Sequence, residues 1–207
     1  MTIPLPLLPD GMFDLPDAQV RLWPQWLDPR EADRLFARLL AELPWEVHRI
    51  RLFGREVDSP RLSCWMGEPE ARYRYSGALF EPHPWHPDLE RLAGRLRLAL
   101  QAPFNSVLAN RYRDGRDAMG WHSDDEPELG DRPVIASISL GATRRFVLKH
   151  RQHPESRLAL DLPHGSLLLM AGDTQHHYRH ALPRTARPVD ERINLTFRGI
   201  QPRPGRR

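Results

Sequence analysis

The sequence predicts an α+β fold in which a layer of helices packs on a double-sheet jelly roll. Helix signals are confined to the first half of the chain, and short apolar runs between turn residues fill the second half. Helices and strands in separate blocks are typical of α+β domains, and several short strands between turn signals are typical of sandwiches and barrels. One domain over residues 21–207, preceded by a proline-broken arm over residues 1–20, accounts for the 207 residues.

The first helix is predicted to begin at Pro29. Asp28 suits the N-cap, Pro29 suits the first helical position, and Glu31 follows the cap by three residues. Apolar residues then recur at helical spacing until Pro44, which ends the run. A second helix is predicted over 87–100, where leucines share one face.

Short strands follow from Phe104 onward, separated by Gly, Pro and Asp. The predicted strands are 107–109, 134–140, 145–148, 158–160 and 166–170. Their number and spacing suggest two packed antiparallel sheets.

The composition is that of an ordinary soluble domain, 40% hydrophobic and 28% charged. Cys64 is the only cysteine, which suits a reducing cytoplasm. We expect a cytoplasmic monomer with no signal peptide and no membrane contact, because no stretch reaches the roughly 18 apolar residues of a membrane helix. The net charge is +3 and Lys149 is the sole lysine, so the charge permits nucleic-acid binding without demonstrating it.

A candidate metal site centres on the run Trp121-His122-Ser123-Asp124. In an extended strand, residues i and i+2 point to one face, so His122 and Asp124 can bind one ion together. Two histidines and one carboxylate form the facial triad of non-haem iron(II) oxygenases. The pair alone is also compatible with an exposed polar turn. The sequence offers three histidines for the third ligand: His176, His177 and His180.

The segment 192–198 alternates strictly between polar and apolar residues, which is typical of a strand. Its polar positions are Arg192, Asn194, Thr196 and Arg198. Two arginines with an amide and a hydroxyl between them, and no acid, favour a site for a dicarboxylate, because guanidinium groups match carboxylates bidentately. The alternative is an amphipathic strand with its polar side in water.

Four motifs stand in order along the chain: Asn110-Arg111-Tyr112, His122-Ser123-Asp124-Asp125-Glu126, His180, and 192–198. Together they resemble the AlkB family of iron(II)- and 2-oxoglutarate-dependent dealkylating dioxygenases, over about residues 53–200. The unbroken His-x-Asp-Asp-Glu run is most similar to members that repair duplex DNA. The resemblance implies a double-stranded β-helix (jelly roll) with supporting helices on one side and a nucleotide-recognition lid over residues 45–80.

The resemblance also implies roles for individual residues. The iron ligands are His122, Asp124 and His180, the last because it precedes Ala-Leu-Pro. Asn110 and Tyr112 would hydrogen-bond 2-oxoglutarate. Arg198 would pair with its distal carboxylate, Arg192 would lie near the metal-bound carboxylate, and Asn194 and Thr196 would complete that wall.

The implied reaction is oxidative demethylation of bases of the 1-methyladenine and 3-methylcytosine type in DNA, with RNA as a further candidate. It consumes molecular oxygen, converts 2-oxoglutarate to succinate, and releases formaldehyde. Tyr73 and Tyr75 match the aromatic lid of the family, and either could instead be ordinary strand packing. Asp125 and Glu126 would supply an acidic group that suits a cationic methylated base.

Two other functions are compatible with parts of the sequence. One is a 2-oxoglutarate-dependent hydroxylase of a small molecule or a protein. The other is a non-catalytic jelly-roll module that retains a metal site. Succinate formation that depends on a methylated oligonucleotide would separate the three.

By residue type alone, the run Arg51-Leu52-Phe53-Gly54-Arg55 favours a buried Leu-Phe pair beside a turn glycine. The resemblance implies instead a hairpin tip that wedges a DNA duplex open, as apolar side chains inserted between base steps do. Phe53→Ala should lower activity on methylated double-stranded DNA by part of the few kcal/mol that base flipping costs, and should affect the same single strand much less. If Phe53 is instead a core residue, the substitution should cost roughly 3–5 kcal/mol of stability and reduce both activities alike. Both activities and the melting temperature of this variant decide between the two.

Overall fold

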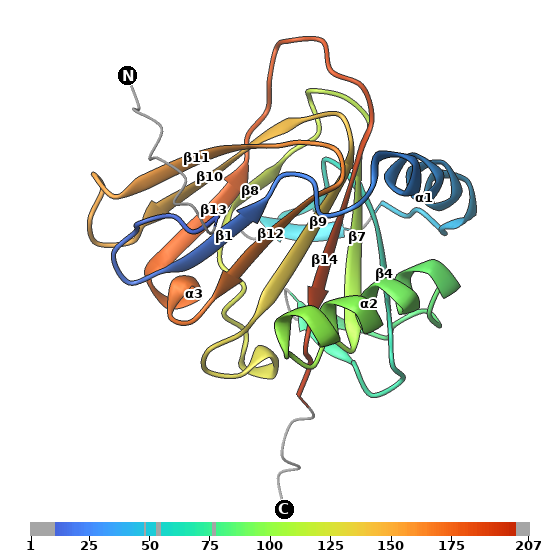
Figure 1. The fold of residues 1–207 in the computed structure, drawn as a ribbon, viewed down its shortest axis with the longest axis horizontal. Coiled ribbons are helices and arrows are strands. Elements are labelled where there is room, and N and C mark those ends of the chain that lie inside the picture. The colour runs from blue at the N-terminus through green and yellow to red at the C-terminus, as the bar shows by residue number, and fades with distance from the viewer. Residues whose placement is uncertain (1–10, 48, 53–54, 76–77, 202–207) are drawn as a thin grey trace, which may run out of the picture.

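The protein folds as two packed β-sheets with two helices on the outer side of the larger sheet (Figure 1). This computed structural model describes residues 11–47, 49–52, 55–75 and 78–201. The larger sheet has the order β1 (Gln19–Trp23), β12 (Ser166–Ala171), β9 (Ile135–Gly141), β14 (Arg192–Arg198), β7 (Ser106–Tyr112), β4 (Leu62–Gly67). The smaller sheet has the order β11 (Arg157–Leu162), β10 (Arg144–His150), β13 (Tyr178–Leu182), β8 (Met119–His122).

Four further strands form two hairpins, and two short helices lie in connections. The hairpins are β2 (Arg49–Leu52) with β3 (Arg55–Asp58), and β5 (Tyr73–Tyr75) with β6 (Ala78–Phe80). The short helices are η1 (Pro127–Leu129) and α3 (Thr174–His177). None of the described helices, the longest of which have 14 residues, could cross a lipid bilayer.

The two long helices confirm the sequence-based boundaries. Helix α1 (Pro29–Glu42) is capped by Asp28, whose side chain accepts hydrogen bonds from the backbone N–H groups of Arg30 and Glu31. Helix α2 spans Pro87–Leu100. Because both helices bury one leucine-rich face, they cover the larger sheet and leave their charged faces in solvent.

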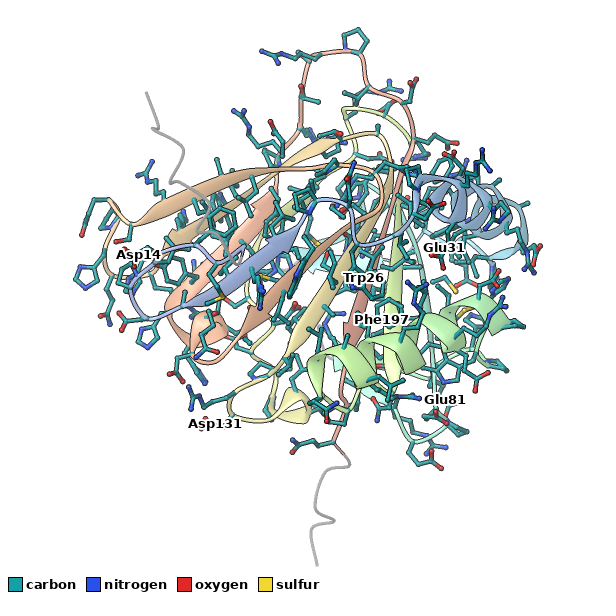
Figure 2. The ribbon with its side chains drawn as sticks, in the orientation of Figure 1. Asp14, Trp26, Glu31, Glu81, Asp131 and Phe197 are labelled. Carbon is teal, nitrogen blue, oxygen red and sulfur yellow. The ribbon has the colours of Figure 1, made fainter. Side chains whose placement is uncertain are left out.

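The apolar core lies in two parts, and this division leaves room for a polar site. One cluster joins α1 and α2 to the outer face of the larger sheet. Ile193, Leu195 and Phe197 of β14 are fully buried there, and Phe197 is labelled in Figure 2. A second cluster, which includes Val20, Leu148 and Met170, fills one end of the space between the sheets. The alternate face of β14, which is polar, therefore points into the space between the sheets.

Residues 11–20 are part of this core rather than a separate arm. Phe13, Leu15 and Val20 are buried, and β1 begins at Gln19 and pairs with β12. The prolines near the N-terminus suggested an irregular arm. The apolar residues of 11–20 are nevertheless buried, because β1 pairs with the edge of β12.

The predicted lid, residues 45–80, contains both hairpins, but β4 within it is an edge strand of the larger sheet. Phe53 lies outside the described residues. Tyr73 and Tyr75 belong to β5, and their side chains likewise lie outside the description.

Candidate metal centre

Three side chains converge between the two sheets: those of His122, Asp124 and His180. His122 and His180 are directly opposite each other on β8 and β13, with ring centroids 4.2 Å apart. Asp124 follows the end of β8 by two residues, and its Oδ2 is 3.9 Å from Nε2 of His180. One potential ligand atom from each residue lies within 4.8 Å of the others. The structure thus brings together the three residues that the motifs nominate.

Hydrogen bonding fixes which nitrogen of His122 can bind a metal. Its Nδ1 lies 2.8 Å from the carbonyl oxygen of Gly120, which can only accept, so Nδ1 carries the proton and Nε2 keeps its lone pair. Desolvation lowers the pKa of His122. Burial, with the neighbouring His122, lowers the pKa of His180 to about 3. Both rings are therefore neutral near pH 7, as metal ligands must be.

Asp124 is held in its ionised form although it is buried. Burial raises its pKa, but Arg198 and the two histidines outweigh burial and lower the pKa to about 2. Nη2 of Arg198 donates to Oδ1 of Asp124 at 2.7 Å, and both side chains are less than one tenth exposed. Two neutral imidazoles and one carboxylate are a donor set that suits iron(II), so the residues present fit the metal that the motifs imply.

A second cluster of the same composition is formed by Asp17, His150 and His177. Its protons are placed differently. Nδ1 of His150 accepts hydrogen bonds from the backbone N–H groups of Gln152 and His153, at 3.1 and 3.0 Å. The neutral ring must then carry its proton on Nε2, the nitrogen that faces Asp17 at 3.5 Å. Because a metal needs that nitrogen deprotonated, this cluster is poorly suited to bind one.

The polar face of β14 forms a continuous hydrogen-bonded wall. Nη2 of Arg192 donates to Ser139 Oγ and to Asn194 Oδ1, at 2.9 and 2.8 Å. Ser137 Oγ donates to the same oxygen of Asn194 at 3.0 Å, and Asn194 Nδ2 donates to Thr196 Oγ1 at 2.7 Å. The wall is therefore rigid, with every amide and hydroxyl of it oriented by a neighbour.

Arg192 is a buried cation that lacks an anionic neighbour in the described part of the chain. It is 1% exposed, and burial lowers its pKa to about 10, so it remains charged near pH 7. Its Nε and Nη1 have no hydrogen-bond partner among the described residues. A buried unpaired charge is costly, and a bound carboxylate that accepts a hydrogen bond from one of these nitrogens would offset part of that cost. The residues present thus also fit an anionic co-substrate such as 2-oxoglutarate.

The structure places Arg198, rather than Arg192, beside the candidate metal ligand Asp124. Arg198 contacts the candidate metal ligand Asp124, whereas Arg192 lies six positions earlier, with its guanidinium 5.3 Å from the ring of Tyr112. Six strand residues span roughly 20 Å. Alternation in the sequence gives the face of each arginine, but only the contact between Arg198 and Asp124 shows which end of β14 lies at the candidate metal centre.

Of the remaining predicted residues that the structure describes, some lie beside this centre and one lies away from it. Asn110 and Tyr112 of β7 line the same pocket, and Oδ1 of Asn110 accepts a hydrogen bond from Arg61 Nε at 2.7 Å. Asp125 forms an ion pair with Arg151, and Glu126 occupies the N-cap position of η1. His176 is exposed and lies beside Asp131, away from the centre.

Several pocket residues were not predicted from the sequence. They are Met119, Ser137, Phe146, Met170 and Leu182. Arg61 and Ser139, which contact Asn110 and Arg192, were not predicted either. The alternation of serines in 135–141 could have revealed Ser137 and Ser139, because that strand pairs with β14. Arg61 carries no such signal, since it is brought to Asn110 only by the pairing of β4 with β7.

Comparisons with known proteins agree with this geometry. The sequence pattern of the 2OG-Fe(II) oxygenase superfamily matches residues 19–198. The alpha-ketoglutarate-dependent dioxygenase alkB homolog 3 of Homo sapiens is 39% identical over 196 residues, which cover 90% of this chain and 68% of the relative. The DNA oxidative demethylase ALKBH2 of Bos taurus is 42% identical over 182 residues, which cover 83% of this chain and 66% of the relative.

The solved structure of OsALKBH1 shares the fold, with a TM-score of 0.65 at 16% identity over 86% of this chain and 97% of that one. The jelly roll predicted from the sequence is thereby confirmed. With the superfamily pattern spanning most of the chain and relatives near 40% identity, the chain belongs to the AlkB family of iron(II)- and 2-oxoglutarate-dependent dioxygenases.

Proposed function

We propose that this protein removes alkyl groups oxidatively from bases in DNA, with RNA as a second substrate, and that it acts as a cytoplasmic monomer. Support comes from the similarity to the Bos taurus relative, a DNA oxidative demethylase, at 42% identity. The structural observation that carries the proposal is a row of three cationic side chains on the outer face of the smaller sheet.

The row consists of Arg157, Lys149 and Arg179, which face one another directly across β11, β10 and β13. Like charges in direct register destabilise a sheet, and none of the three forms an ion pair with a carboxylate among the described residues. Nζ of Lys149 also lies 4.2 Å from the ring centroid of Trp121, which is 46% exposed. A phosphate backbone would neutralise this row, and an exposed indole beside it suits a nucleic acid.

At the centre, we propose that His122, Asp124 and His180 hold the iron. Bound iron, with 2-oxoglutarate and oxygen, would supply the oxidation that hydroxylates the alkyl carbon. The chain would supply orientation: Gly120 sets the tautomer of His122, and Arg198 keeps Asp124 ionised and fixes its Oδ1. The arrangement leaves part of the coordination sphere to the co-substrate and oxygen.

We propose that Arg192 pairs with the distal carboxylate of 2-oxoglutarate, because its Nε and Nη1 need acceptors. Asn110 and Tyr112 would hydrogen-bond the same molecule from β7. Asn194 and Thr196 would form the rigid wall beside it.

The base pocket remains a proposal from the sequence. Asp125 and Glu126 would receive the flipped base from the side of the metal. Tyr73, Tyr75 and Phe53, within the lid over 45–80, would contact the base and the duplex. An acidic residue next to the metal favours a cationic methylated base over a neutral small molecule.

The proposed function is tested by a turnover screen with 1-methyladenine and 3-methylcytosine in single- and double-stranded DNA and RNA. Succinate and formaldehyde should form together, and their formation should depend on the lesion. Succinate formation that ignores every methylated oligonucleotide would favour the hydroxylase of a small molecule or protein instead.

Substitution of the metal-binding residues should separate them from the other histidines. His122→Ala, Asp124→Ala and His180→Ala should each abolish turnover, because each removes one of three protein ligands. His176→Ala and His177→Ala should retain it. Loss of turnover in His177→Ala, together with full turnover in His180→Ala, would show that the third ligand is His177 rather than His180.

The two arginines should differ in what they support. Arg192→Met should raise the apparent KM for 2-oxoglutarate by roughly 100- to 4,000-fold, since removing one partner of a buried ion pair costs about 3–5 kcal/mol. Arg198→Met should mainly weaken iron binding through Asp124. An unchanged KM in Arg192→Met with a large rise in Arg198→Met would restore the order that the sequence suggested.

The row of cations should contribute to binding of nucleic acid. The triple variant Lys149→Gln, Arg157→Gln, Arg179→Gln should raise the Kd for DNA and reduce the slope of log K against log salt by roughly 2–3. The control triple variant Arg30→Gln, Arg34→Gln, Arg91→Gln, on the helical face, should leave both unchanged. Equal effects of the two triple variants would mean that the row is not a specific contact.

A further inference from the structure

Arg151, in the turn between β10 and β11, contacts the segment that carries Asp124. Its Nη2 lies 2.8 Å from Ser123 Oγ and 3.4 Å from the carbonyl oxygen of Gln175, and it also donates to Oδ2 of Asp125. An isolated ion pair on a protein surface contributes little. This guanidinium differs because a single nitrogen serves three acceptors from two segments that flank the metal centre.

The acceptors of Arg151 are themselves fixed. Ser123 Oγ donates its proton to the carbonyl oxygen of Tyr178 at 2.7 Å, so it can only accept from Arg151. The backbone N–H of Asp124 donates to Oε1 of Gln175 at 3.0 Å. Hydrogen bonds therefore run in one direction, from Arg151 through Ser123 to the strand that carries His180.

The turn that holds Arg151 is anchored independently. The backbone N–H of Arg151 donates to the carbonyl oxygen of His177 at 2.7 Å, and the Nδ1 of His150 accepts from the next two backbone N–H groups. The backbone that carries the guanidinium is therefore held in place by hydrogen bonds that do not involve Asp125.

We propose that Arg151 is a positioning residue for substrate recognition, which acts by holding the carboxylate of Asp125. This inference rests on the proposed function, in which Asp125 receives the base. Asp125 is 41% exposed on its side chain, so without a partner it would sample several rotamers. Held by Arg151 at Oδ2, it presents Oδ1 as an acceptor in one place, while the guanidinium compensates part of its charge. Recognition of the base then depends on the position of Oδ1 of Asp125 as well as on the attraction between this carboxylate and a cationic methylated base.

The test is a double-mutant cycle with Arg151→Gln and Asp125→Asn, measured on a methylated oligonucleotide. Arg151→Gln alone should raise the KM for the oligonucleotide roughly tenfold, the scale of one charge-assisted hydrogen bond, with a smaller change in kcat. In the Asp125→Asn background, Arg151→Gln should raise the KM for the oligonucleotide by less than about twofold, because the carboxylate that Arg151 positions is absent. Fully additive losses would overturn the inference.

Three controls separate positioning from stability and from the proposed function. Arg132→Gln breaks another exposed arginine–aspartate pair, with Asp173, and should leave the KM for the oligonucleotide unchanged. Arg151→Lys keeps the charge and should recover part of the loss; if Arg151→Gln does not fold, Arg151→Lys replaces it in the cycle. A rise in the KM for 2-oxoglutarate equal to that for the oligonucleotide would indicate general damage and overturn the inference. A wild-type protein without lesion-dependent turnover would refute the proposed function itself.

Discussion

The buried contact between Arg198 and Asp124 is the interaction on which the rest of the site depends. Asp124 follows β8 of the smaller sheet and Arg198 ends β14 of the larger one, so the pair joins the two sheets at the candidate metal centre. Removing one partner of such a pair typically costs about 3–5 kcal/mol. The same contact keeps the carboxylate ionised beside two uncharged histidines, and it leaves Oδ2 on the side of His180.

Hydrogen-bond direction, rather than proximity, distinguishes this centre from the second cluster of two histidines and one aspartate. In both clusters the ligand atoms lie close together. His122 donates from Nδ1 to a carbonyl and keeps a lone pair for a metal, whereas His150 accepts at Nδ1 and must carry its proton on the nitrogen that faces Asp17. A search by distance alone would rank the two equally, while the placement of protons favours one.

Much of the fold and part of the site could be predicted from the sequence. The caps and leucine spacing of α1 and α2 are local signals, and strict alternation defined β14 to the residue. The contact of Arg198 with Asp124 and the contact of Arg61 with Asn110 could not be predicted, because each depends on how strands that are distant in the sequence pack together. Residues 11–20 were assigned to an arm because their burial depends on the edge of β12.

The division of the core explains why a polar centre can exist inside a small domain. Helices and one apolar cluster stabilise the outer side of the larger sheet, and a second cluster holds the sheets together at one end, so the other end can bury charged groups. We infer that this polar end of the space between the sheets is a preformed site for one iron. An anaerobic iron(II) titration without nucleic acid, on the wild type and on Asp124→Asn, tests it most directly. One ion per chain, lost in Asp124→Asn, is the predicted result; two ions, or one ion that survives the substitution, would contradict it.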